Sequence, residues 1–192
     1  MCCDLRLRTL IMVLVDTGMR VGIEALKLKW IDFDFEESII TVTQSKTTSG
    51  LRTLPMTPLV KSALLEWRAA TNGTSEYVFF NPQRPSVHIL SVKTAWHNAL
   101  RMAGLPPFPI YQCRHTCATR LAASGVSDTI IDQLLGHSRR DVLRFYTARV
   151  LEYLRHAMLR LDQLRTAKTA PSMPSRIDDI DETPGKRSIV VN

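Results

Sequence analysis

The sequence predicts a mainly α-helical fold that also contains a small antiparallel β-sheet, an α+β arrangement. Most segments repeat apolar side chains every three or four residues, the period that gathers them on one face of a helix. Two short β-branched segments, residues 38–43 and 51–56, enclose a polar turn, as the strands of a β-hairpin do. The chain has 192 residues, of which 45% are hydrophobic, so it is long enough to bury a core.

Residues that cap or stop helices mark where the expected elements begin and end. Gly18 interrupts the apolar run near the N-terminus, and Thr57 followed by Pro58 is a strong helix start. Pro55 confines the second strand of the hairpin to a sheet edge or marks its end. A third strand is expected at 77–80. The expected helices cover residues 5–15, 20–28, 58–70, 91–102, 112–124, 127–135, 139–147 and an amphipathic stretch around 151–161.

The composition changes after Arg165. Prolines and many Ser, Asp and Thr residues occur there with almost no large apolar side chain, a composition typical of disordered segments. We therefore expect one folded domain over residues 1–165 and a disordered tail over 166–192. The charges of the tail cancel, so the formal net charge of +7 belongs to the folded part.

The excess of basic residues indicates an anionic partner, above all nucleic acid, because clustered Lys and Arg side chains release condensed counterions on binding. The longest uninterrupted apolar run, residues 10–15, is far too short to cross a bilayer, and no signal-peptide cleavage site follows it. We expect a cytoplasmic protein with no membrane contact. The four cysteines lack the C-x-x-C spacing of zinc sites, and we expect Cys113 and Cys117 to be small, buried thiols.

Two arginines, a histidine and a tyrosine stand in contexts that suit phosphate chemistry. Arg114 follows Tyr111-Gln-Cys, His137 follows Leu-Leu-Gly, Tyr146 comes nine residues after that histidine, and Arg20 ends a Thr-Gly-Met-Arg motif. Arginine presents a rigid fork of donors that matches two phosphate oxygens, so two arginines can neutralise charge that a metal ion would otherwise neutralise. No acidic cluster is arranged as a magnesium site, so we expect no metal and no cofactor.

Taken in order, these motifs resemble the catalytic domain of the tyrosine recombinases, the phage integrase family. The resemblance covers roughly residues 5–160. Its elements, in chain order, are Thr17-Gly-Met-Arg20 with Glu24, Lys46 on the hairpin with Arg52-Thr-Leu-Pro after it, Tyr111-Gln-Cys-Arg114-His-Thr, Leu134-Leu-Gly-His137, and Tyr146. Any one of them alone would be weak, whereas five in order make a specific match.

The resemblance implies site-specific recombination or integration of double-stranded DNA, as carried out for mobile genetic elements, through a covalent 3′-phosphotyrosine intermediate. Tyr146 would be the nucleophile, and Lys46 would protonate the leaving 5′ oxygen. His137 would donate a hydrogen bond to the phosphate, which Arg20 and Arg114 would hold.

Three further residues have expected roles around this site. Glu24 lies four residues after Arg20, on the same face of a helix, where it can hold that arginine in place. His115, next to Arg114, is expected to support the site structurally rather than to react. Tyr153 is the rival of the proposed nucleophile, but its place on the final amphipathic helix predicts a core position.

The match departs from the commonest family pattern in three ways. Tyr111 stands where most members have a histidine; we keep it among the catalytic residues as a hydrogen-bond donor, although tyrosine is a poorer base near neutral pH. The spacing from Arg20 to Glu24 is four residues, where three is commoner. We also expect the chain to be a catalytic domain without the N-terminal core-binding domain that members usually carry.

Several features have a second interpretation. Arg139, Arg140 and Arg144 are candidates for contacts with the DNA backbone, although a solvated face explains them nearly as well. In this family the segment after the tyrosine often docks on a neighbouring protomer, so the final helix either supports self-association on DNA or packs on its own domain. The alternative functions are a non-catalytic DNA-binding remnant or regulator, and DNA relaxation like that of a type IB topoisomerase.

Overall fold

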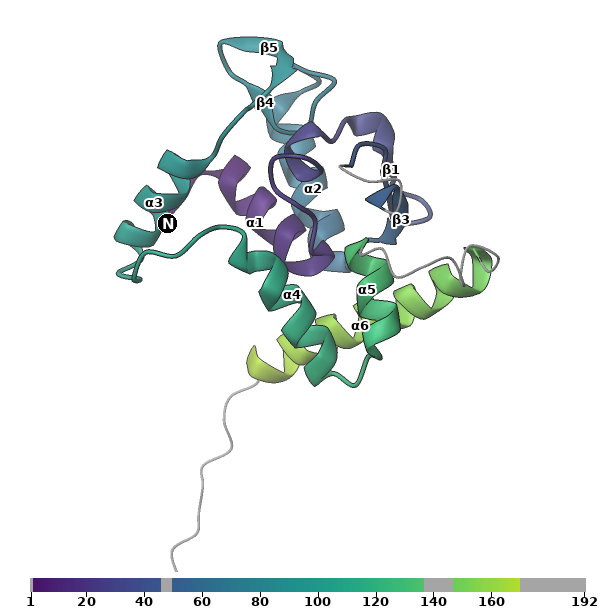
Figure 1. The fold of residues 1–192 in the computed structure, drawn as a ribbon. Helices are drawn as coiled ribbons and strands as arrows, with labels where there is room; N and C mark the ends of the chain where they lie inside the picture. Colours follow the sequence, from purple (N-terminus) through teal and green to yellow (C-terminus); the bar gives the residue numbers. More distant parts are fainter. Residues whose placement is uncertain (1, 46–49, 137–146, 170–192) are drawn as a thin grey trace, which may run out of the picture.

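Helices dominate the structure, a computed structural model that describes residues 2–45, 50–136 and 147–169; of 147–150, 164 and 166–169 it describes only the backbone. The elements are α1 (Leu5–Thr17), η1 (Ala25–Lys27), η2 (Trp30–Asp32), β1 (Phe33–Asp34), β2 (Ile39–Val42), β3 (Arg52–Pro55), α2 (Pro58–Thr71), β4 (Phe80–Asn81), β5 (Arg84–His88), α3 (Lys93–Met102), α4 (Gln112–Ala123), α5 (Asp128–Leu135) and α6 (Thr147–Thr169), where η marks a short 3₁₀ helix. Helices with two small antiparallel sheets confirm the predicted mainly α fold (Figure 1).

The first helix, α1, contacts both α2 and α4 and supplies much of the core (Figure 1). Its N-terminus is capped by Asp4, whose side chain accepts a hydrogen bond from the backbone N–H of Leu7 at 2.8 Å. Gly18 ends the helix with a φ of 63°, and a side chain at this position would overlap that of Leu135. This glycine therefore lets the end of α1 approach the end of α5 closely.

The predicted β-hairpin is confirmed. Strands β2 and β3 are antiparallel, with Val42 opposite Arg52 and Ile39 opposite Pro55. Strand β1 pairs with the other side of β2, so β3 is an edge strand that ends at its proline, as expected for a residue without an N–H. Of the strand expected at 77–80, only the last residue belongs to a strand, β4. It forms a second hairpin with β5, which the sequence patterns miss because β5 is largely exposed and does not alternate in burial.

The helix expected over 20–28 is wrong, because the chain makes a wide turn there. The backbone N–H of Ala25 donates to the carbonyl of Arg20 at 3.0 Å, and that of Leu26 donates to Val21 at 2.9 Å. Both bonds reach five residues back, whereas an α-helix reaches four, so the turn accommodates one extra residue. Only the short 3₁₀ helix η1 follows it.

The final helix, α6, packs on its own chain, against β3, α4 and α5. The side chains of Leu154, Met158 and Leu161 are buried, as the predicted apolar face requires. Tyr153 is 62% exposed, so the prediction that it is a core residue is wrong. It neighbours a buried leucine in sequence, and successive helical residues lie about 100° apart, so it points away from the core.

Two predictions concern the segments around α6. The helix ends at Thr169, four residues past the expected domain boundary at Arg165. The rest of the expected tail, residues 170–192, and residues 139–146 of the expected short helix lie outside the described residues. Within the described ranges, no helix is both long enough and apolar enough to cross a membrane.

Candidate active site

Part of the predicted site lies in the described residues. Arg20 and Glu24 belong to the wide turn after α1, whereas Arg114 and His115 lie on α4, which begins directly after Tyr111. The predicted site residues outside the described ranges are Lys46, His137, Tyr146 and the three DNA-backbone candidates Arg139, Arg140 and Arg144. The described part of the site therefore consists of its arginines and the elements that hold them.

The predicted pair of Arg20 and Glu24 is present. Nη1 of Arg20 donates to Oε1 of Glu24 at 2.5 Å, and the backbone N–H of Arg20 donates to Oε2 at 3.1 Å. The side chain of Glu24 is inaccessible to solvent, whereas that of Arg20 is 25% exposed. The contact is made through a wide turn rather than along a helix face, and it leaves the guanidinium of Arg20 partly accessible.

Arg114 is held by backbone carbonyls. It is buried on α4; its Nη1 donates to the carbonyl of Gly18 at 2.6 Å and its Nη2 to that of Leu135 at 2.7 Å. Burial lowers the pKa of Arg114 below its usual value, and the charges of Arg20 and Arg52 lower it further. Arginine remains protonated despite such shifts, and its five N–H groups exceed these two bonds. The side chain therefore stays a cation with donors to spare.

A third arginine, Arg52 on β3, joins this cluster and is absent from the predicted site. Its Nη2 donates to Oε2 of Glu24 at 3.0 Å, its Nε to the carbonyl of Leu134 at 2.6 Å, and its Nη1 to that of Gly50 at 2.7 Å. The only sequence signal for it is its place in the Arg-Thr-Leu-Pro motif. A strand pattern cannot show that this side chain reaches Glu24.

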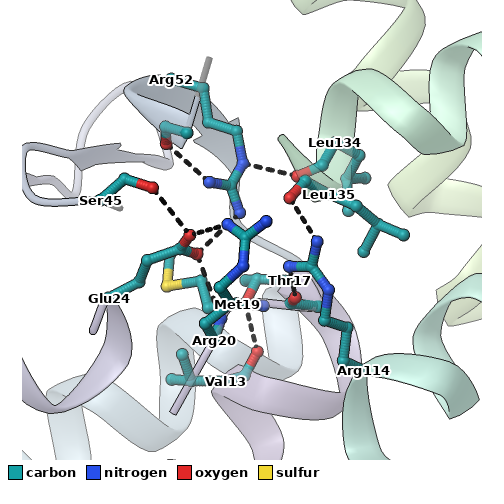
Figure 2. Close-up of polar contacts among 12 residues, drawn as sticks. Val13, Thr17, Met19, Arg20, Glu24, Ser45, Arg52, Arg114, Leu134 and Leu135 are labelled. Atoms are coloured by element: carbon teal, nitrogen blue, oxygen red, sulfur yellow. Dashed lines mark hydrogen bonds and ion pairs between the residues drawn. The ribbon is translucent and has the colours of Figure 1, made fainter. Parts of the chain in front are cut away.

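Positive charge exceeds negative charge in this cluster. Figure 2 shows the guanidinium groups of Arg20, Arg52 and Arg114 gathered between Glu24 and the last turn of α5. Burial alone would raise the pKa of Glu24, but the charge of Arg52 and hydrogen bonds from Arg52 and Arg20 hold it below its ordinary value. Glu24 is thus ionised at neutral pH, and three positive charges share one negative charge among the described residues. Such an arrangement attracts an anion, and guanidinium forks match phosphate oxygens.

Tyr111 and His115 form an aromatic pair at the start of α4. Their ring centroids lie 5.1 Å apart with an interplanar angle of 80°, an edge-to-face contact. Tyr111 is 48% exposed, and His115 is also exposed. The contact gives the imidazole a packing partner one helical turn away.

Comparisons with known proteins give consistent results. The model of the phage integrase family matches residues 1–152. The tyrosine recombinase XerA of Pyrococcus furiosus is 31% identical over 163 residues, which cover 83% of this chain and 56% of that relative.

Solved structures of similar fold support the same assignment of architecture. The crystal structure of XerA recombinase matches with a TM-score of 0.60 at 26% identity, covering 86% of this chain and 57% of that chain. The Tn1549 transposon integrase in complex with circular intermediate DNA matches with a TM-score of 0.59 at 22% identity, covering 84% and 59%. The chain thus spans about half the length of the curated relatives it matches.

Proposed function

We propose a function for this chain, which belongs to the phage integrase family. In this proposal, the chain cleaves and rejoins DNA at specific sites through a covalent 3′-phosphotyrosine intermediate. The observation that carries the proposal is the cluster of Arg20, Arg52 and Arg114 around the single carboxylate of Glu24. The name of the Pyrococcus furiosus relative and the DNA bound to the Tn1549 integrase support double-stranded DNA as the substrate.

In the proposed reaction, Arg20 and Arg114 bind the non-bridging oxygens of one phosphodiester. Attack on phosphorus adds negative charge to these oxygens, and donors fixed in advance stabilise that charge at little reorganisation cost. The carbonyls of Gly18 and Leu135 fix Arg114, and Glu24 fixes Arg20. The arginines thereby take the electrostatic role that a metal ion has in many phosphoryl-transfer enzymes.

Tyr146 is the proposed nucleophile. The nearby arginines favour loss of its phenol proton to water. The phenolate oxygen then forms a bond to phosphorus while the bond between phosphorus and the 5′ oxygen breaks, and Lys46 gives that oxygen a proton. His137 and Tyr111 donate hydrogen bonds to the phosphate. The phosphotyrosine ester conserves the bond energy, so a 5′-hydroxyl can reverse the step without ATP.

The wider organisation of the protein is also a proposal. Residues 1–165 act as a catalytic domain, and Arg139, Arg140 and Arg144 contact the DNA backbone. The chain self-associates on DNA through α6. Because the apolar face of α6 is buried on its own chain, association through that face requires exchange of the helix between copies, which rebuilds the same contacts in trans. The transposon origin of one structural neighbour supports a role in a mobile genetic element, acting on DNA in the cytoplasm.

A suicide-substrate assay tests the proposed chemistry. The probes are nicked duplexes covering the DNA that flanks the gene, and the readout is a protein–DNA adduct that resists SDS. We expect the wild-type chain to form an adduct, and Tyr146→Phe to form none while still binding DNA. Tyr153→Phe is the matched control, because Tyr153 is an exposed tyrosine on α6 and should not be needed.

Each other outcome changes the assigned function or the assigned nucleophile. A wild-type chain that binds the duplexes but links to none is a DNA-binding remnant or regulator. Adducts lost in Tyr153→Phe and retained in Tyr146→Phe would move the nucleophile to Tyr153. Relaxation of a supercoiled plasmid without strand exchange would favour topoisomerase-like activity.

A further inference from the structure

We propose that Arg52 is a positioning residue that fixes three segments of the phosphate site relative to one another; this inference rests on the proposed function. All three nitrogens of its guanidinium donate to the protein: Nη2 to Glu24, Nε to Leu134 and Nη1 to Gly50. The side chain is only 8% exposed. Arg52 is therefore committed to the architecture of the site, while the more accessible Arg20 faces the phosphate.

The first segment is the wide turn that carries Arg20. Arg52 and Arg20 hold the two oxygens of the Glu24 carboxylate, Oε2 at 3.0 Å and Oε1 at 2.5 Å (Figure 2). Burial alone would raise the pKa of Glu24, and the charge of Arg52 is the largest of the effects that lower it. Arg52 thus keeps Glu24 ionised, and an ionised Glu24 anchors Arg20 in place.

The second segment is the hairpin tip that carries Lys46, between β2 and β3. On one side of it, the hydroxyl of Ser45 donates to Oε1 of Glu24 at 3.3 Å. On the other side, the carbonyl of Gly50 accepts from Arg52 at 2.7 Å. The ion pair of Arg52 and Glu24 therefore ties both flanks of the tip to the same point.

The third segment is the end of α5, which leads to His137. The last carbonyls of a helix lack partners within it and carry partial negative charge. Arg52 donates to the carbonyl of Leu134, and Arg114 donates to the next one, that of Leu135. These two arginines fix the backbone two and three residues before His137, so Arg52 links the end of α5 to the flanks of the hairpin tip and to the wide turn.

The geometry explains why this position needs arginine. A guanidinium holds three nitrogens in fixed directions in one plane, whereas lysine has a single nitrogen and cannot serve three acceptors on three segments. With lysine at position 52, the charge near Glu24 remains but the segments lose their common anchor. A displacement of about 1 Å in such a site lowers a rate by about 100-fold.

The test compares Arg52→Lys with Arg120→Lys, the matched control. Arg120 also donates to a helix carbonyl, that of Leu161 at 3.5 Å, and also lies near a buried carboxylate, that of Asp16 at 3.8 Å. Adduct formation is measured in single turnover on saturating nicked DNA, per folded molecule, together with the DNA dissociation constant. We expect Arg52→Lys to slow adduct formation by about 100-fold and to change DNA affinity by about 2-fold at most, and the control to behave as wild type.

Hydrogen exchange supplies a readout that needs no DNA. In Arg52→Lys, the backbone amides of residues 20–26 and 130–136 should exchange faster than in the wild-type chain and in Arg120→Lys. If the wild-type chain forms no adduct, the proposed function fails and this exchange still decides the role of Arg52. The inference is overturned if Arg52→Lys exchanges these amides as slowly as the wild-type chain at both segments, or if it cleaves DNA at the wild-type rate per folded molecule.

Discussion

Two buried carboxylates with arginine partners lie in different surroundings in this molecule. Glu24, in the wide turn, pairs with Arg20 at 2.5 Å and with Arg52 at 3.0 Å. Beside them, Arg114 donates to backbone carbonyls instead of to a carboxylate. Among the described residues, three guanidinium groups therefore lie near a single carboxylate, and two of them pair with it.

Asp16, at the end of α1, lies in a balanced cluster instead. Its Oδ1 pairs with Arg165 and lies 3.8 Å from Arg120, and its Oδ2 accepts a hydrogen bond from Thr57 at 2.6 Å. Arg165 also pairs with Asp162 at 3.2 Å. Among the side chains that the structure describes, two carboxylates thus meet two guanidinium groups, and the cluster fastens α6 to α1, α2 and α4.

The difference between the two clusters lies in charge balance, not in burial. Both carboxylates are inaccessible, and the side chains of Arg20 and Arg120 are 25% and 26% exposed. Balanced ion pairs largely cancel their own field, whereas an excess of guanidinium groups leaves a positive potential for an incoming anion. An excess of arginine over carboxylate, rather than the presence of arginine, distinguishes the proposed phosphate site from the second cluster.

The largest effect is expected for Arg114→Ala. Removing a preorganised donor and its charge should lower the cleavage rate by about 1,000-fold, measured by rapid quench on nicked DNA. The change also leaves the carbonyls of Gly18 and Leu135 without their donor, which should cost about 2 kcal/mol of unfolding free energy. Rates are therefore compared at equal folded fraction, and a loss smaller than about 10-fold would remove Arg114 from the phosphate site.

Neutralising each carboxylate in turn separates the two clusters. Both Glu24→Gln and Asp16→Asn should lower the free energy of unfolding by about 2 kcal/mol, because each removes the charge of a buried carboxylate from its arginine partners. Only Glu24→Gln should also slow cleavage, by about 30-fold, because Arg20 loses its anchor. Urea unfolding and single-turnover cleavage give the two numbers, and equal slowing in both variants would refute the comparison.

The smallest effect is on the pH dependence of stability. Burial alone would raise the pKa of Glu24, but Arg52 and Arg20 hold it below 4.5, its ordinary value. A folded-state pKa below the unfolded value adds stability that is complete above pH 4.5 and is lost as the pH falls through the folded pKa. The unfolding free energy of the wild-type chain should therefore fall more steeply with acid than that of Glu24→Gln. Parallel curves would show that Glu24 is not held ionised by its arginines.

The sequence predicted the parts of the site that depend on motif order. Arg20 and Arg114 are far apart in the chain, and the spacing from Arg20 to Glu24 differs from the usual pattern. The structure nevertheless brings all three side chains together. The hairpin was also predictable, because β-branched residues flank a polar turn. Helix periods alone, in contrast, wrongly predicted a helix over 20–28, where two successive hydrogen bonds to the fifth residue back form a wide turn.

The parts that could not be predicted depend on long-range contacts. Arg52 reaches Glu24 and Leu134 from a different element, and no local pattern records that. The same holds for Asp16, whose partner Arg165 lies 149 residues away. A charged residue such as Asp16 at the end of an apolar helix indicates that it has a partner. Only the packing of α6 shows that this partner is Arg165.

The most direct test of the account is the rate of adduct formation in Arg20→Ala beside that in Arg120→Ala. Both arginines are about one-quarter exposed and lie next to a buried carboxylate, but only Arg20 belongs to the cluster with excess positive charge. On saturating nicked DNA, we expect Arg20→Ala to form adduct at least about 100-fold more slowly than wild type, and Arg120→Ala within about 3-fold of it. Equal rates in the two variants would contradict the assignment of the phosphate site.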